Sequence, residues 1–252
     1  MLNGEVWFHV KHDGSGDEAR MTQEPDVDDA ERAAVASSPP PLAAAVFGDR
    51  LGLAQRYCAI LATEGIDHGL MGPREVPRLW DRHILNCAVL GEAIEEGQSV
   101  IDIGSGAGLP GIALAIARPD LRITLVEPLL RRSDFLLRTV SALGLTVDVV
   151  RGRAEEKAVR SDVARADVVT SRAVAPLERL TRWSAPLIKD GGRLIALKGS
   201  SAADEIERDR KAAERNGIVG LRVESVGESI VEPVTTLVIG DKRGTPQRRR
   251  VK

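Results

Sequence analysis

The order of hydrophobic and polar residues predicts two kinds of structure in this chain. In residues 43–66 and 74–95, apolar side chains recur at helical spacing, and Gly48 and Gly52 are expected to interrupt the first stretch. From residue 99 onward, short β-rich runs alternate with longer helical patterns. Such alternation is typical of βαβ units, in which helices cover both faces of a parallel sheet.

The alternating region predicts seven strands. Five of them are separated by helices and are expected to be parallel, whereas the last two are joined by a turn-rich segment and are expected to form a hairpin. The expected strands are 99–103, 122–127, 146–150, 167–171, 193–198, 221–226 and 234–239. The expected helices are 109–118, 129–143, 154–164, 176–188 and 201–216. The predicted fold class is therefore α/β, with a Rossmann-like, mostly parallel sheet, a terminal hairpin and an N-terminal helical cap.

Charge is distributed unevenly along the chain, although the formal net charge of its 252 residues is only −2. Residues 1–38 carry nine acidic and three basic side chains, whereas residues 241–252 carry six basic and one acidic. The near-neutral total therefore does not exclude a nucleic-acid partner, because the basic tail is either a solvated segment or a phosphate-binding arm. We expect a disordered acidic extension over 1–41, a helical cap over 42–98, an α/β domain over 99–240 and a flexible basic tail over 241–252.

Composition excludes several classes of protein. Two cysteines exclude a disulfide scaffold and a four-cysteine zinc site. His9 and His12 lie three residues apart with no further ligand near them in the sequence, so no metal site is predicted. No stretch approaches the roughly 18 apolar residues that a membrane-spanning helix needs.

A glycine-rich loop follows the first expected strand and indicates a nucleotide-type cofactor. Two patterns overlap there. Residues 106–111 read G-x-G-x-x-G, and Glu127 lies about 20 residues further on, as an NAD-binding fingerprint requires. Residues 102–108 read D-I-G-S-G-A-G, which fits the acidic-x-G-x-G-x-G pattern of S-adenosylmethionine sites.

The second pattern is favoured for three reasons. It places Gly104 directly at the strand end, where the tight turn is needed. An acid at Asp102 would repel a pyrophosphate but can serve the methionyl end of S-adenosylmethionine. The expected terminal hairpin is also the known variation of this fold in class I methyltransferases. Glu127 then stands where a carboxylate can bind both ribose hydroxyls.

Five sequence blocks resemble one family. They are LWDRHILN at 79–86, DIGSGAGLPG at 102–111, RGRAEE at 151–156, SRA at 171–173 and ALKG at 196–199. The blocks are similar to those of the small-subunit ribosomal RNA methyltransferase G family, also called glucose-inhibited division protein B, over residues 42–240. The resemblance implies methyl transfer from S-adenosylmethionine to N7 of one guanosine in 16S rRNA, near the decoding site.

The same resemblance implies a set of cofactor-binding residues. Gly104 and Leu109 are expected to line the pocket, Ala154 and Glu155 to lie by the adenine, and Arg172 to contact the cofactor or its surroundings. Together with the residues of the loop pattern, the expected cofactor-binding set is Asp102, Gly104, Gly106, Gly108, Leu109, Glu127, Ala154, Glu155 and Arg172.

The sequence lacks the catalytic motifs that methylation of cytosine C5 or of an exocyclic amine needs, and this absence agrees with methylation of guanine N7. Neither Cys58 nor Cys87 follows a proline, as the nucleophile for cytosine C5 usually does, and both are expected to be buried. No Asp/Asn-Pro-Pro-Tyr motif for exocyclic amines is present. N7 carries an exposed lone pair and no proton, so catalysis reduces mainly to positioning, and no catalytic residue is predicted.

Local basic residues are the candidates for RNA contacts. Arg131 and Arg132 open the helix after Glu127, and Lys198 falls at a strand end, where open α/β sheets bind ligands. His83 has two interpretations, a helix histidine that is hydrogen-bonded within the domain or an RNA contact at the cofactor entrance. With only 3% aromatic residues, recognition is expected through phosphates and RNA shape.

The predicted function is thus a cytoplasmic, monomeric enzyme that binds S-adenosylmethionine and acts on 16S rRNA or the 30S ribosomal subunit, without a membrane partner. Two alternatives stay open at this point. One is an NAD-dependent oxidoreductase that uses the same loop, and the other is a non-catalytic ribosome-binding factor that keeps the cofactor pocket for structure.

Overall fold

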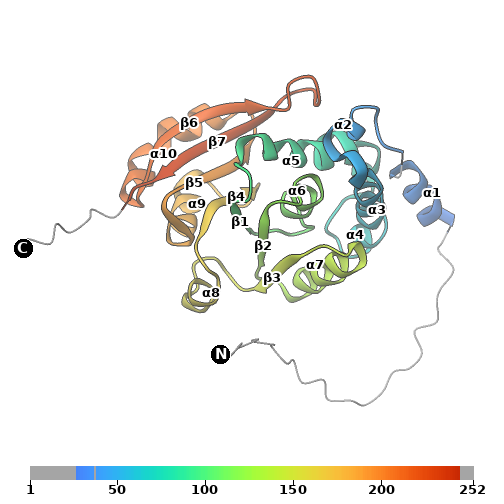
Figure 1. Cartoon of the computed structure of the whole chain (residues 1–252), viewed down its shortest axis with the longest axis horizontal. Coiled ribbons are helices and arrows are strands. Elements are labelled where there is room, and N and C mark those ends of the chain that lie inside the picture. Colours follow the sequence, from blue (N-terminus) through green and yellow to red (C-terminus); the bar gives the residue numbers. More distant parts are fainter. Residues whose placement is uncertain (1–26, 37, 245–252) are drawn as a thin grey trace, which may run out of the picture.

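A seven-stranded sheet forms the centre of the computed structural model, which describes residues 27–36 and 38–244 (Figure 1). The strand order is β3-β2-β1-β4-β5-β7-β6, and β7 runs antiparallel to both of its neighbours. The strands are β1 (Ser99–Ile103), β2 (Arg122–Glu127), β3 (Val147–Arg151), β4 (Ala166–Arg172), β5 (Ile188–Lys198), β6 (Ile218–Val226) and β7 (Thr235–Lys242). The predicted fold class and the terminal hairpin are confirmed.

Helices cover both faces of the sheet and define two apolar cores. One core contains α6 (Gly111–Ala117), α7 (Leu130–Leu143) and the N-terminal helices. The other contains α8 (Lys157–Asp162), α9 (Leu177–Ser184) and α10 (Ala202–Arg215). Successive side chains of a strand point to opposite faces, so Val100 joins the first core and Ile101 the second.

The N-terminal cap consists of short segments rather than two long helices. Gly48, at φ +49°, ends the helix Ala43–Phe47, whereas Gly52 lies inside the helix Leu51–Ala62 and does not interrupt it. The segments are α2 (Ala43–Phe47), η1 (Gly48–Arg50), α3 (Leu51–Ala62), α4 (Glu64–Asp67), η2 (Pro73–Arg78), η3 (Leu79–Leu85), α5 (Asn86–Ala88) and η4 (Val89–Ala93). The segment η3 is π-helical, and such turns are frequent at functional sites.

Part of the extension that was expected to be disordered forms a helix. Residues Val27–Ala36 form α1, and Ala36 is buried, with its carbonyl oxygen 2.5 Å from the indole nitrogen of Trp80. A buried indole N–H needs an acceptor, and α1 supplies it. Residues 1–26 and Ser37 of the extension and residues 245–252 of the basic tail lie outside the described residues, as do His9 and His12.

Most other element boundaries differ from the prediction by a few residues, and β5 and α8 are clear examples. The strand expected at 193–198 begins at Ile188, because Gly191, at φ +81°, allows a bulge within the strand. Ile188 pairs with Ala166 across that irregularity. Helix α8 has only six residues, so it covers less of the sheet than the expected helix at 154–164.

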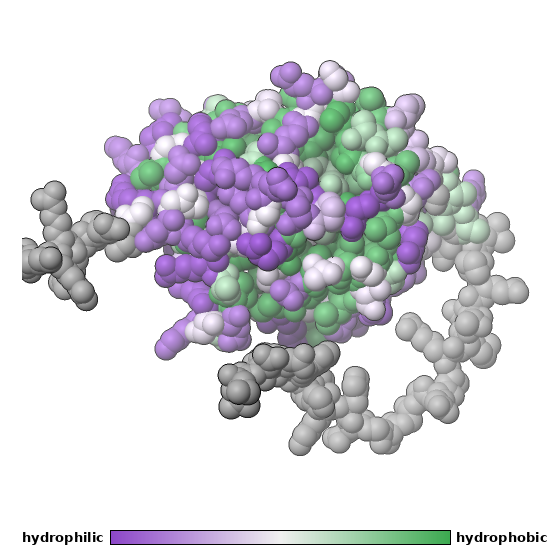
Figure 2. Space-filling view, viewed as in Figure 1, coloured by the Kyte–Doolittle hydropathy of each residue, from purple (hydrophilic) through white to green (hydrophobic). Residues whose placement is uncertain are grey.

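Hydrophilic side chains dominate the surface over β6, β7 and α10, and hydrophobic ones are more frequent toward α2 and α3 (Figure 2). Within the described residues, no helix is long and apolar enough to cross a membrane.

Candidate functional site

The glycine loop between β1 and α6 turns beneath a cavity at the carboxyl edge of the sheet. Gly104, Gly106 and Gly108 all have positive φ, at +70°, +56° and +92°, where a side chain would be strained. A Cβ on Gly104 would lie 2.8 Å from Val174, whereas one on Gly106 would meet nothing closer than 3.8 Å. The loop therefore fits its surroundings tightly at Gly104 and leaves open space above Gly106.

Glu127, the last residue of β2, holds this loop in place through hydrogen bonds. Its side chain is buried, with Oε2 accepting a hydrogen bond from the Gly106 N–H at 2.9 Å and Oε1 accepting one from the Leu129 N–H at 3.0 Å. Each carboxylate oxygen has a second acceptor site. Glu127 also lines the cavity, so it is able to accept hydrogen bonds from a ligand while it holds the loop.

The cavity above the loop has two parts. The larger, of about 570 Å³, is lined by Gly104, Gly106, Leu109, Glu127 and Arg172 of the expected cofactor set, and also by Leu70, Met71, Ser105, Ala107, Pro128, Leu129, Arg132, Arg153, Ala173 and Val174. The smaller, of about 160 Å³, is lined by the expected Ala154 and Glu155 with Ile103, Gly104, Val126, Pro128, Gly152, Arg153, Val174 and Trp183. Most of its walls are apolar, as suits a planar ring.

Asp102 and Gly108 do not line either part of this cavity. Gly108 lies beneath the loop, where a Cβ would come within 2.9 Å of the Tyr57 hydroxyl. Asp102 is fully buried, and its Oδ2 accepts a hydrogen bond from the Gly111 N–H at 3.1 Å, where α6 begins. Burial raises the pKa of Asp102 to about 7. Its position indicates that it shapes the loop and the start of α6 from below.

Arg172, at the end of β4, is anchored by the cap. One guanidinium nitrogen donates to the Cys87 Sγ at 3.2 Å, and another donates to His83 Nδ1. Because an arginine only donates, Nδ1 must be the acceptor, and Nε2 carries the proton that His83 donates to Glu75 Oε2 at 2.8 Å. Burial, followed by the nearby Arg172 charge, lowers the pKa of His83, which favours this neutral ring.

Two of the expected RNA contacts have hydrogen-bond partners within the protein. Of the two interpretations of His83, the structure agrees with a helix histidine that is hydrogen-bonded within the domain, because the residue is only 6% exposed and both ring nitrogens have partners within the protein. Lys198 is also no free surface cation, since its Nζ lies 2.7 Å from Glu205 Oε2 and donates to the Ala175 carbonyl at 3.1 Å. Arg131 and Arg132 are exposed in the first turn of α7, and Arg132 reaches the cavity.

Several residues of the site escape prediction from the sequence. Tyr57 is fully buried and donates to the Ala107 carbonyl at 2.8 Å, which ties α3 to the glycine loop. Leu70 and Met71 bring the cap to the cavity, and Glu75 orients His83. These residues carry no motif, because their positions depend on how the cap packs against the sheet. Cys58 and Cys87 are both buried, as expected.

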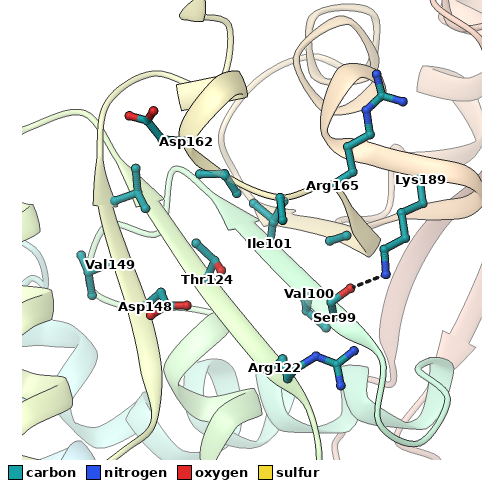
Figure 3. A pocket seen from close by; sticks show the side chains of 14 residues that line it. Ser99, Val100, Ile101, Arg122, Thr124, Asp148, Val149, Asp162, Arg165 and Lys189 are labelled. Atoms are coloured by element: carbon teal, nitrogen blue, oxygen red, sulfur yellow. Dashed lines mark hydrogen bonds between the residues drawn. The ribbon is translucent and has the colours of Figure 1, made fainter. Parts of the chain in front are cut away.

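Another cavity, of about 560 Å³, opens at the opposite edge of the sheet (Figure 3). Ser99, Arg122 and Lys189 lie near the beginnings of their strands there, and Lys189 Nζ donates to Ser99 Oγ at 3.1 Å. It contains no residue of the glycine loop. Ligands of open α/β sheets bind at the carboxyl edge, so the cavity above the glycine loop is the candidate site. Among the described residues, no cluster suited to a metal ion occurs.

The fold and the loop define the class of protein. A glycine turn after β1, a carboxylate at the end of β2 and an antiparallel β7 between β5 and β6 are the features of class I S-adenosylmethionine-dependent methyltransferases. A solved methyltransferase from Pyrococcus furiosus shares the fold, with a TM-score of 0.50 and 13% identity over 64% of this chain and 83% of that chain.

Sequence comparison identifies the family within this class. Residues 50–233 match the family described as rRNA small subunit methyltransferase G. The ribosomal RNA small subunit methyltransferase G of Rhodococcus jostii is 61% identical over 81% of this chain and 89% of that protein. Its counterpart in Corynebacterium efficiens is 62% identical over 79% and 86% of the two chains. The chain therefore belongs to the rRNA small subunit methyltransferase G family.

The raised pKa of Asp102 predicts how pH affects stability. In the unfolded chain an aspartate ionises near pH 4, whereas the folded chain favours the protonated form up to about pH 7, so the wild type loses stability as the pH rises between these values. Asp102→Asn keeps an oxygen for the Gly111 N–H and removes the ionisation. Urea unfolding at several pH values should show the wild type losing about 2–3 kcal/mol relative to this variant between about pH 5 and 7. A stability difference that is constant with pH would contradict the burial argument.

Proposed function

We propose that this chain transfers a methyl group from S-adenosylmethionine to N7 of a guanosine in 16S rRNA, near the decoding site. The observation that carries the proposal is the glycine loop of a class I fold, fastened by Glu127 beneath a cavity, in a chain of the rRNA small subunit methyltransferase G family. No observation favours the NAD-dependent oxidoreductase, since β7 is antiparallel and the loop pattern is the methyltransferase one.

The residues of the cavity fit S-adenosylmethionine part by part. The apolar slot beside Ala154, Val126 and Trp183 suits the adenine ring. The free acceptor sites of Glu127 suit the two ribose hydroxyls. The space that Gly106 leaves open suits the methionyl part, and the Arg172 guanidinium suits its carboxylate.

The chemistry requires positioning rather than proton removal. When bound, S-adenosylmethionine supplies an electrophilic methyl group. Guanine N7 has an in-plane lone pair and no proton, so the protein has to hold the base in line and exclude competing geometries. Both ring nitrogens of His83 have partners within the protein, and the free acceptor sites of Glu127 are assigned to the ribose hydroxyls, so this proposal gives neither residue the role of a general base.

Methyl mapping tests this proposal directly. We expect 30S ribosomal subunits from cells that lack the enzyme to gain one N7-methylguanosine after incubation with the chain and S-adenosylmethionine. Borohydride–aniline treatment then cleaves the 16S rRNA at that nucleoside. If S-adenosylhomocysteine binds but no cleavage appears on either free rRNA or the subunit, the chain is a non-catalytic ribosome-binding factor.

RNA contacts are proposed for the exposed cations at the mouth of the cavity. Arg131 and Arg132 follow Leu129 and Leu130, whose side chains are 50% and 55% exposed. Neither arginine forms a hydrogen bond or ion pair with the other described residues, so both are available to rRNA phosphates. The pair thus combines cations with an apolar rim where the RNA must approach.

The double variant Arg131→Ala/Arg132→Ala should bind 16S rRNA more weakly and with a flatter salt dependence. Each lost phosphate contact removes about 0.7–0.9 from the slope of log K against log salt concentration. Filter binding over a salt titration measures the slope. Arg210→Ala/Lys211→Ala, which removes two exposed cations from α10, is the matched control. Equal slopes for the two double variants would exclude the proposed contact.

The partner and location of the enzyme remain parts of this proposal. We place the reaction in the cytoplasm, on 16S rRNA that is either free or within the 30S subunit, with the chain acting as a monomer. We assign the basic residues of 241–252 to this proposal as an additional RNA-binding segment.

A further inference from the structure

A separate cavity of about 470 Å³ lies beside the candidate cofactor site, at the carboxyl ends of β4 and β5. Ala173 and Val174 line both cavities, so the two spaces meet at this wall. The remaining lining residues are Ala175, Pro176, Lys198, Ser201, Asp204, Glu205 and Arg208. Ala173 has φ +53°, which is unusual for a residue with a Cβ and is typical of functional sites.

One charged group of this cavity has no partner within the described protein. Lys198 is held by Glu205 and by a backbone carbonyl, and Arg208 donates through two nitrogens to Asp209. Asp204, in the first turn of α10, forms no hydrogen bond or ion pair with any described residue. Its carboxylate is therefore the acceptor that the cavity offers to a ligand.

We propose that this cavity binds the target base and that Asp204 determines its identity as guanine. This inference rests on the proposed function. Guanine presents two neighbouring donors, N1–H and the 2-amino group, which match the two oxygens of a carboxylate. Adenine presents an unprotonated N1 at the same place, which a carboxylate repels. Lys198 has three N–H groups and uses two, so one is left for guanine O6.

This placement also directs the reacting atom toward the cofactor site. On the purine, N7 lies on the side away from the 2-amino group. A base held by Asp204 at the α10 side therefore turns N7 toward the Ala173–Val174 wall that the two cavities share. A backbone phosphate is a poor alternative occupant, because Asp204 and Glu205 would repel it.

Inosine in place of the target guanosine tests the contact, because it lacks the 2-amino group and keeps N7. The 16S rRNA is joined from two pieces, with inosine or guanosine at the position found by methyl mapping, and kcat/KM is measured for both. The wild type should prefer guanosine by about tenfold to a hundredfold. Asp204→Ala should methylate guanosine more slowly and lose the preference, with a ratio within about twofold of one.

The control is Glu207→Ala, which removes an exposed carboxylate of α10 that does not line the cavity and should keep the wild-type ratio. If Asp204→Ala methylates neither RNA, Asp204→Asn replaces it. This variant retains one acceptor and should show a ratio between those of the wild type and one. Binding of the two RNAs to the wild type without cofactor should also favour guanosine over inosine. A wild type that does not discriminate, or an Asp204 variant with the wild-type ratio, overturns the inference. Absence of methylation by the wild type contradicts the proposed function instead.

Discussion

Glu127 ends β2 with a buried carboxylate beneath the glycine turn, and one oxygen accepts from the Gly106 N–H while the other accepts from the Leu129 N–H. These two bonds join the loop that follows β1 to the segment that follows β2. Charge-assisted bonds of this kind are stronger than neutral ones, particularly when buried. Both segments line the cavity, and so does Glu127 itself.

The helical cap completes the site from the other side. Tyr57 donates to the carbonyl of Ala107 and supports the loop, and His83 accepts from Arg172 and fixes its guanidinium. Glu75 in turn orients His83. Through these contacts, a region that carries no cofactor motif determines how the cofactor site is shaped. The π-helical turn at Leu79–Leu85 places His83 inward toward Arg172.

Prediction from the sequence succeeded where a residue's role follows from local spacing. The positions of β1 and β2 agree to the residue, because their apolar runs are bounded by clear turns, and Gly104 and Glu127 follow directly from those strand ends. The spacing of the glycine motif did not distinguish a side chain that faces the cavity from one that lies beneath the loop. Asp102 therefore looked like a ligand, although alternation along β1 turns it toward α6.

Roles that depend on tertiary packing were not predictable. The sequence presents Lys198 as a free cation at a strand end, but α10 brings Glu205 to it. It leaves two interpretations of His83 open, because the partners that decide between them lie up to 89 positions away. Asp204 carries no signal in the sequence, because its significance comes only from the cavity that β4, β5 and α10 enclose together.

Titration calorimetry measures whether the loop held by Glu127 is a site for S-adenosylmethionine. The wild-type chain should bind S-adenosylhomocysteine and should not bind NADH. Glu127→Gln puts an amide NH₂ against a backbone N–H, so its affinity should fall by about tenfold or more. Binding of NADH without S-adenosylhomocysteine, or unchanged affinity in Glu127→Gln, would contradict the account.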